Sequence, residues 1–414
     1  MDNESTFPAD KKTVLMFGCF DSKGEDFSYL HACLKAQEIN ILTMNTGTYD
    51  STASFDDDVI AAEVADVSGT SLDELRKADD RGLAVTKMGE GAAFVIAKLV
   101  KEVRIDGAIS MGGGGGTYIA LSAMQAMPFG MPKLCLSTIA TKDLSRQIGA
   151  KDITLMPSIV DVAGLNSISR VLISQAAGSI AGMVASSMVQ YEKKTGSIAI
   201  SMFGNTTECV EICTKILKEK GYDVLTFHSV GVGGRTMESL ILDDCFDAVL
   251  DITTTELADD LCEGICSAGP DRLTAAAKMG IPQVVVPGCL DMVNYGHKDT
   301  VPEKYKSREL YSWAPDVTLM RTNEEENRTL GLRLAEKLNA SKGPVTIILP
   351  LKGISKVSSE GGVFYRPEVD RVLFDSIKEK TSEHISIVEL EANINEAVFA
   401  EHAVAELLAM LGVN

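Results

Sequence analysis

Positive charge is scarce in this sequence of 414 residues. It carries 39 lysines and arginines against 58 aspartates and glutamates, which gives a formal net charge of -19 at pH 7. This balance argues against a protein whose surface binds nucleic acid or an anionic membrane. It leaves room for a local anion site, because backbone amides at a helix start bind phosphate without a charged side chain.

Aromatic residues, long apolar runs and clustered cysteines are scarce as well. Aromatics make up 6% of the chain, and no uninterrupted apolar run reaches the length of a membrane span. Residues 1–12 are polar and do not resemble a signal peptide. The nine cysteines are odd in number and scattered, which favours reduced thiols over a disulfide framework. We therefore expect a cytoplasmic protein that binds neither nucleic acid nor a membrane.

Two pairs of cysteines stand four residues apart: Cys209 with Cys213, and Cys262 with Cys266. This spacing equals one helical turn, so each pair is expected on one face of a helix. A metal pair is the alternative, but buried thiols on a helix face are commoner. The sequence therefore predicts no metal site.

A weak internal repeat organises what is there. Residues 13–18 read as a short apolar strand that ends in Met-Phe-Gly, and residues 197–204 read as a second strand with the same ending. Each is followed by a polar loop, an amphipathic helix and another strand. In the first half the loop is expected to run to about Asp26 and the helix from about Phe27 to Gln37.

Each half then continues with a further strand–turn–helix–strand unit, at residues 107–137 and 248–287. Strands that alternate with helices imply right-handed crossovers and a parallel sheet. The predicted fold class is α/β, with two Rossmann-like, doubly wound parallel-sheet domains. We place the first, nucleotide-binding domain at 1–194 and the second at 195–414, after a helix rich in small residues that is expected at Ser174–Val189 and should pack closely against another helix.

Five consecutive glycines follow the strand that ends at Met111. Ligands of open α/β sheets bind beyond the carboxyl ends of the strands, where the strand order reverses. The run Gly112–Gly116 removes every Cβ, so that several backbone amides can converge on an anion before a helix expected at about Thr117. Thr117 is expected to cap that helix or to contact the phosphate. The run is neither a P-loop nor a strict dinucleotide fingerprint, and a flexible turn is the alternative.

Polar side chains elsewhere in the first half complete this prediction. Asp21 and Ser22 follow the first strand and can cap the next helix or accept hydrogen bonds from a sugar hydroxyl. Lys23 supplies the positive charge that the glycines lack, although a solvated lysine at a helix start is an equal alternative. Arg81 opens another helix, and beside a phosphate it would act as a clamp.

The second half presents different polar groups at its strand ends. His228 ends one strand, Glu256 follows another, and Asp291 and His297 follow a third. These four side chains are candidate acid–base groups of a pocket for a small molecule. The turn Gly231–Gly234, followed by Arg235, is expected to hold a carboxylate or a single phosphate. The sequence shows no Ser-His-Asp order and no zinc spacing, so it specifies no reaction.

Several longer phrases resemble a known family, that of the ATP-binding domain of the tomato mosaic virus resistance protein with its bacterial and fungal relatives. The phrases lie between Thr13 and Leu411 at residues 17–25, 110–117, 161–170, 253–259, 267–272 and 290–294. The resemblance implies two Rossmann-like subdomains, a homodimer and bound ATP, and whether magnesium accompanies the ATP stays open. The family's ATP contacts fall here on Asp21, Ser22, Lys23, Thr48, Arg81, Gly113, Gly114, Gly115 and Gly116. Ser22 replaces the family's threonine, and Gly114–Gly115 replaces a stretch that contains serine.

The resemblance does not decide whether the protein is an enzyme. Our leading hypothesis is a nucleotide-binding protein whose second lobe serves a small molecule or a partner. One alternative is an enzyme that acts on a small carboxylate or phosphate between the lobes, with ATP as cosubstrate or regulator. A further alternative is an interaction protein in which ATP rigidifies a dimer.

Overall fold

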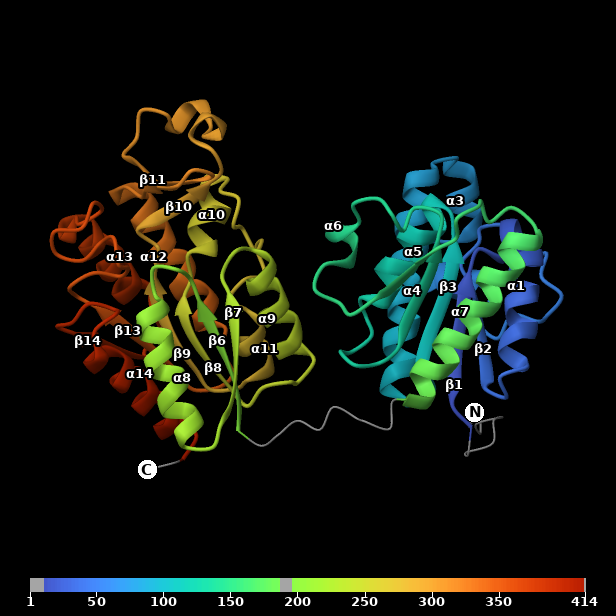
Figure 1. Ribbon diagram of the computed structural model, residues 1–414, viewed down its shortest axis with the longest axis horizontal. Helices are drawn as coiled ribbons and strands as arrows, with labels where there is room; N and C mark the ends of the chain where they lie inside the picture. The colour runs from blue at the N-terminus through green and yellow to red at the C-terminus, as the bar shows by residue number, and fades with distance from the viewer. Residues whose placement is uncertain (1–10, 187–195, 413–414) are drawn as a thin grey trace. The chain divides into compact units, whose positions relative to one another are not determined.

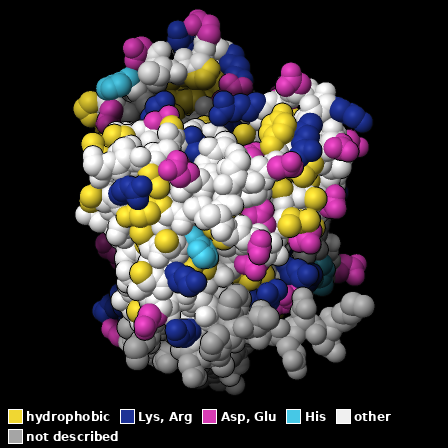
Figure 2. Space-filling view, turned by 90° about the vertical axis from the view of Figure 1, so that its right-hand side faces the viewer, with side chains coloured by type: hydrophobic (Ala, Val, Ile, Leu, Met, Phe, Trp, Pro, Cys, Tyr) yellow, Lys and Arg dark blue, Asp and Glu magenta, His cyan; other side chains and the backbone are white. Residues whose placement is uncertain are grey.

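The computed structural model describes residues 11–186 and 196–412. The chain divides into two compact units, Met1–Glu192 and Lys193–Asn414. The expected domain boundary and the last residues of the helix expected at Ser174–Val189 lie outside the described residues. Acidic and basic side chains are interspersed on the face that Figure 2 shows.

Unit 1 is built on a five-stranded parallel sheet of order β2-β1-β3-β4-β5. Strands β1 and β3 are buried along their whole length, because helices cover both faces of the sheet and their apolar runs leave no polar side for solvent. The strands are β1 (Thr13–Gly18), β2 (Asn40–Asn45), β3 (Gly107–Gly112), β4 (Lys133–Ser137) and β5 (Thr154–Pro157).

Two layers of helices enclose that sheet, as the right-hand part of Figure 1 shows. Helices α1 (Phe20–Lys35) and α7 (Ser167–Ser186) share one apolar cluster with it. Helices α2 (Ala61–Val67), α4 (Arg81–Lys101) and α5 (Gly114–Met124) share the other. The short helices α3 (Leu72–Ala78) and α6 (Ser145–Ile148) lie in the connections.

Helix α7 is the one helix of the described chain that is long and apolar enough to cross a membrane. A single such helix is weak evidence for a span, and α7 packs against α1, β3 and β4 as a core helix does. Ala176, Ala177 and Ile180 of α7 are fully buried in the apolar cluster that α7 shares with α1 and the sheet. The small residues of α7 predicted a close neighbouring helix, and α1 is that neighbour. Gly178 and Gly182, however, face open space.

Unit 2 repeats this plan on a six-stranded parallel sheet of order β14-β13-β9-β8-β6-β7. The first two strands along the chain, β6 and β7, pair with each other, and the third, β8, pairs with the other edge of β6, as in unit 1. The predicted fold class is thereby confirmed. The strands are β6 (Ser197–Met202), β7 (Asp223–His228), β8 (Ala248–Thr253), β9 (Gln283–Gly288), β13 (Val345–Pro350) and β14 (Ser386–Leu390).

Helices α8 (Thr207–Glu219) and α14 (Ala397–Met410) cover one face of this sheet. The helices that cover its other face are α9 (Val232–Leu242), α10 (Glu256–Cys262), α11 (Ala275–Met279), α12 (Glu324–Asn339) and α13 (Pro367–Lys380). A small antiparallel sheet, which the sequence did not predict, contains β10 (Met292–Tyr295), β11 (Leu310–Ala314) and β12 (Val317–Arg321). Two single 3-10 turns, Lys298–Thr300 and Glu303–Tyr305, precede β11.

All nine cysteines are free thiols. Cys209 and Cys213 are buried on α8, where they pack in the apolar core as expected. The expectation for the second pair is wrong in detail. Glu263 adopts a left-handed backbone with φ 59° and ends α10 at Cys262, so Cys266 lies beyond the helix.

Candidate functional site

A cavity of about 550 Å³ opens at the carboxyl end of the unit 1 sheet. The strand order reverses between β1 and β3, since the chain runs from β1 to β2 on one side and from β3 to β4 on the other. The cavity lies at this switch point, which is where doubly wound sheets bind ligands. All nine residues predicted to hold a nucleotide line it: Asp21, Ser22, Lys23, Thr48, Arg81, Gly113, Gly114, Gly115 and Gly116.

The glycine run forms a helix start rather than the expected loop. Gly112 ends β3, Gly113 is the N-cap of α5, and Gly114–Gly116 are its first helical turn. The amides of a first turn have no partner inside the helix, and the helix dipole makes this end partly positive. A Cβ at Gly114 would meet no atom within 4 Å, so this position faces open space in the cavity. The loop before α5 is thus shorter than expected, but backbone amides at the start of the helix can still converge on an anion.

Thr117 does not reach the cavity. It is fully buried, and its hydroxyl shares a hydrogen bond of 2.6 Å with the Ser137 hydroxyl at the end of β4. Its amide donates to the Gly113 carbonyl at 2.8 Å. The expectation that Thr117 caps the helix or contacts a phosphate is therefore wrong, and its side chain instead ties the start of α5 to the sheet.

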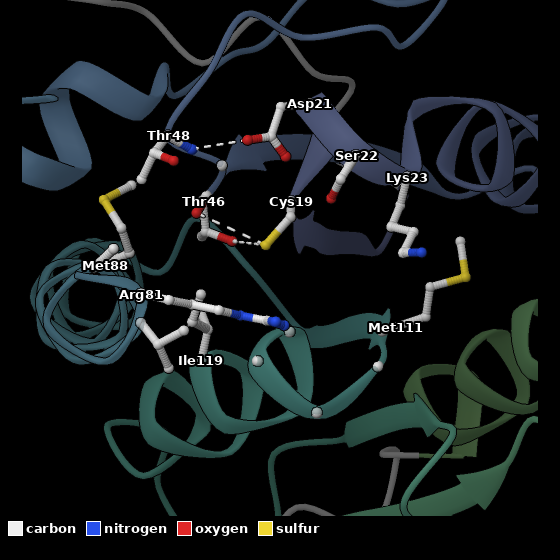
Figure 3. Close-up of a pocket in the computed structure, with 18 of the residues that line it drawn as sticks. Cys19, Asp21, Ser22, Lys23, Thr46, Thr48, Arg81, Met88, Met111 and Ile119 are labelled. Carbon is white, nitrogen blue, oxygen red and sulfur yellow. Dashed lines mark hydrogen bonds between the residues drawn. The ribbon is translucent and has the colours of Figure 1, made fainter. Parts of the chain in front are cut away.

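Lys23 and Arg81 bring positive charge to the cavity from two different helices. Figure 3 shows Arg81 extending from the start of α4 toward the first turn of α5. A Cβ at Gly115 would lie 3.4 Å from Arg81 Nη2, so the guanidinium reaches that turn. Within the described parts of the chain, no acceptor or carboxylate pairs with either cation. Both are thus available to an anionic ligand.

Lys23 owes its position to an early start of α1. The helix begins at Phe20, although a loop was expected as far as Asp26, because Phe20 and Phe27 are both buried against the sheet. Lys23 interrupts the helix with a non-helical backbone, φ -129° and ψ 21°. Gly24 allows the Thr52 backbone to approach α1 closely, since a Cβ at position 24 would lie 2.4 Å from that backbone.

Asp21 fixes the loop that carries Thr48. Its carboxylate accepts hydrogen bonds from the amides of Thr48 and Tyr49, at 2.9 and 3.1 Å, and Figure 3 marks the first of these. Gly47 leaves the room that this requires, because a Cβ there would lie 2.5 Å from Asp21 Cγ. Ser22 is exposed at the rim. Asp21 therefore positions the loop, in addition to lining the cavity.

An apolar wall was missed by the sequence analysis. Ala84, Val85 and Met88 line the cavity from α4, and Ile119 lines it from α5. The α4 residues stand three, four and seven positions after Arg81, which is the spacing of one helix face. Once Arg81 had been placed at a helix start, this spacing in the sequence could have indicated the apolar wall.

Cys19 lies in the middle of the cavity wall, where its thiol contacts Thr46. Burial and the nearby charge of Asp21 raise the pKa of the Cys19 thiol to about 11. The group is therefore a neutral thiol at pH 7 and not a thiolate nucleophile.

The corresponding switch point of unit 2 is filled by its own side chains. Glu256 is fully buried, and its carboxylate accepts hydrogen bonds from the amides of Gly231 and Gly234 at the start of α9, at 2.7 and 3.1 Å. Arg272 completes this arrangement by donating to Glu256 at 2.6 Å. The Gly231–Gly234 turn, expected to hold a ligand carboxylate or phosphate, thus already holds an internal one. Arg235 donates to the Ser267 carbonyl.

The other candidates of unit 2 are dispersed. Asp291 is fully buried and accepts from the Ser355 hydroxyl at 2.7 Å. Burial raises the pKa values of both Asp291 and Glu256. His228 and His297 are exposed, and His297 contacts the Pro315 carbonyl. In the part of the chain that the structure describes, no hydrogen bond or ion pair joins any two of these four side chains, so the geometry does not support a shared acid–base centre.

Two doubly wound α/β units, one of them with an open cavity at its switch point, define a bilobal Rossmann-like protein. Residues 12–188 and 195–411 match the N-terminal and C-terminal domains of the uncharacterised protein family UPF0261. The chain belongs to this family.

The relatives extend over most of the chain. A UPF0261 protein of Clostridium tetani is 42% identical over 97% of this chain and 99% of its own length. The ToMV resistance protein Tm-1(GCR237) of Solanum lycopersicum is 37% identical over 80% of this chain and 45% of the tomato protein. The predicted resemblance is thereby confirmed. A solved UDP-GlcNAc 2-epimerase from Neisseria meningitidis overlaps 66% of this chain and 82% of its own at 10% identity, but with a TM-score of only 0.23.

Proposed function

We propose that unit 1 binds ATP in the cavity between the ends of β1 and β3. The observation that carries this proposal is the convergence of three anion-binding features on one cavity. These are the free first-turn amides of α5, the Lys23 ammonium and the Arg81 guanidinium. Backbone amides and unpaired cations together match the triphosphate, which needs both hydrogen-bond donors and positive charge.

The remaining walls suit the rest of the nucleotide. Val85, Met88 and Ile119 offer an apolar surface on which an adenine ring can pack. The cavity volume of about 550 Å³ lies in the range of about 300–1,000 Å³ that is common for ligand pockets. The family resemblance implies the same ligand on the same residues.

Magnesium would arrive with the phosphates. The described residues contain no group of three or more His, Cys, Asp or Glu side chains that is arranged to hold a metal ion. Mg²⁺ commonly keeps several waters and binds through phosphate oxygens with one or two carboxylates. We therefore propose that any Mg²⁺ binds together with ATP, and we assign no metal site to the protein alone.

We further propose that the protein is a homodimer, as the resemblance implies, and that it is cytoplasmic. Nine free thiols suit a reducing compartment. The switch point of unit 2 is occupied by Glu256 and Arg272, so we assign no ligand to it. ATP binding without assigned chemistry is therefore the function that the site supports best.

Gly114→Val tests this function. Because position 114 faces open space, the valine should leave the fold intact and project into the volume assigned to the phosphates. Calorimetry should show ATP binding to the wild type and none to the variant. Gly178→Val is the matched control, since Gly178 is exposed on α7 and also has no neighbour within 4 Å. Equal affinities for Gly114→Val and the wild type would refute the assignment of the phosphates to α5.

A further inference from the structure

A second cavity, of about 510 Å³, adjoins the first within unit 1. It is walled by the turns that follow β4 and β5, and it shares Thr138 and Asp161 with the nucleotide cavity. The carboxyl ends of neighbouring parallel strands therefore carry two cavities side by side. The two shared residues stand at their junction.

The polar side chains of this second cavity are hydroxyls and one carboxylate. Among the described residues that line it there is no lysine, arginine or histidine, and Asp161 is the single charged one. The carboxylate of Asp161 and the hydroxyls of Thr138 and Thr141 make no hydrogen bond or ion pair within the described ranges. The Ser137 and Ser158 hydroxyls are engaged, with Thr117 and with the Val160 carbonyl, both at 2.6 Å.

This donor and acceptor set disfavours an anion and favours hydroxyl groups. A carboxylate accepts hydrogen bonds and offers none, whereas each threonine hydroxyl can both donate and accept. A second anion here would face Asp161, and no cationic side chain is among the described residues that line this cavity. A molecule that presents several hydroxyls satisfies all three free groups at once.

The turn that presents Asp161 is held in a strained conformation. Ile159 is β-branched and 75% exposed, yet its φ is 62°, in the left-handed region. The Val160 amide donates to the Ser158 carbonyl at 2.6 Å, and the Ser158 amide donates to the Ser137 carbonyl at 3.0 Å, which ties the turn to β4. Backbone strain of this kind tends to occur at binding sites. Here it fixes the backbone directly before Asp161.

We propose that the second cavity binds an uncharged, polyhydroxylated small molecule next to the nucleotide. Asp161, Thr138 and Thr141 hold its hydroxyls, and Asp161 stands where the two ligands meet. The adjacency to a nucleotide rests on the proposed function, whereas binding in the second cavity does not. A single monosaccharide or cyclitol is small enough for the volume.

The test uses the full-length protein and a fixed set of probes: D-glucose, D-ribose, glycerol and myo-inositol, with D-gluconate and glucose 6-phosphate as anionic counterparts. Saturation-transfer NMR should detect at least one uncharged probe and should show weaker binding of its anionic counterpart. Thr141 lines the second cavity and not the first, so Thr141→Val should weaken the polyol about tenfold and leave ATP affinity unchanged. Thr86→Val, an exposed threonine on α4 that lines neither cavity, is the matched control.

The outcomes separate this inference from the nucleotide proposal. Gly114→Val should abolish ATP binding and preserve the polyol, which shows two independent sites. If ATP binds and no uncharged probe does at tens of millimolar, the inference is wrong and the proposed function stands. Loss of ATP affinity in Thr141→Val would mean one continuous nucleotide site. If Asp161→Asn weakened magnesium-dependent ATP binding and left polyol binding intact, Asp161 would serve the metal instead, and our assignment of its role would fail.

Discussion

Lys23 and Arg81 are the two cations that line the open cavity of unit 1, and neither is engaged by another described residue. We expect Lys23→Ala and Arg81→Ala each to weaken ATP binding about tenfold or more, because each removes a charge-assisted contact to phosphate. The loss should shrink at high salt, since screening reduces what a partly exposed charge contributes. Calorimetry at two salt concentrations measures both effects. Lys98→Ala, at an exposed position later on α4, should bind ATP normally.

The thiol of Cys19 provides a reporter of the same cavity. Because its pKa is raised to about 11, the reactive thiolate is rare at pH 8 and increases about tenfold for each pH unit up to that value. Alkylation by iodoacetamide, followed by peptide mass spectrometry, should accelerate accordingly between pH 8 and pH 10. ATP should slow the reaction by covering the site. Cys33, the other half-buried cysteine, lies outside the cavity and should show no protection; equal protection of both would point to a general change of the fold.

Residue types at strand ends were enough to predict which residues line the open cavity of unit 1. Lys23, Arg81 and the glycines could be placed because the carboxyl ends of parallel strands meet at one edge. The same reasoning could not show what the side chains bind. Asp21 holds the Thr48 loop, and Glu256 fills a helix start of its own unit, because such hydrogen bonds join segments 22–28 residues apart in the chain. Sequence pattern carries no information on which acceptor a buried amide selects.

The first residues of α1 and α5 could not be predicted from the sequence. Helix α5 begins within the glycines, although glycine itself disfavours helix, because the whole helix packs against the sheet and α4. Tertiary packing also determines the first residue of α1, because the helix begins at Phe20, whose side chain is buried. Periodicity predicted both helices but placed their first residues too late.

The crossing of α4 and α2 determines where the apolar wall of the cavity lies. A Cβ at Gly91 would lie 1.9 Å from the Val64 carbonyl oxygen, which is backbone and cannot turn aside. We expect Gly91→Ala to lower the free energy of unfolding by about 1–3 kcal/mol, as overpacking does. ATP affinity should fall as well, because α4 carries Arg81 and Met88.

Urea unfolding with calorimetry of ATP binding measures both consequences. Gly178→Ala is the matched control, because it places the same side chain on an exposed helix position with no neighbour within 4 Å. Alanine is favoured over glycine in a helix by about 1 kcal/mol, so this variant should be slightly more stable than the wild type. A Gly91→Ala protein as stable as that control would show that α4 can shift without cost.

The whole molecule carries one strand plan twice, and the two copies differ at their switch points. In unit 1 the position after the third strand is glycine, and the space beside it is open. In unit 2 the equivalent position, after β8, is the buried run Thr254–Glu256, and the side chain of Arg272 occupies the space beside it. The repeat was predictable from the sequence. The filling of its second switch point was not, because Arg272 lies 16 residues after its partner Glu256.

Arg272 should therefore determine the stability of unit 2 and not ligand binding in unit 1. Its guanidinium is fully buried and donates to Asp251 at 2.6 and 2.7 Å, to Glu256 at 2.6 Å and to Glu238 at 3.2 Å. Arg272→Met leaves these buried carboxylates without their cation, a change that typically costs about 3–5 kcal/mol. Arg333→Met is the control, because Arg333 forms only a half-exposed ion pair with Asp260 and such pairs are worth about 1 kcal/mol or less.

Differential scanning calorimetry with and without ATP separates the two units. Since each unit has its own core, we expect two unfolding transitions in the wild type. Arg272→Met should lower the midpoint of one transition, by about 6–20 °C if each kcal/mol shifts it by about 2–4 °C. ATP should raise the midpoint of the other transition alone, because a ligand stabilises only the unit that it binds. One transition that responded to both the substitution and ATP would mean that the units unfold together, and ATP stabilisation of the Arg272-dependent transition would place the nucleotide in unit 2.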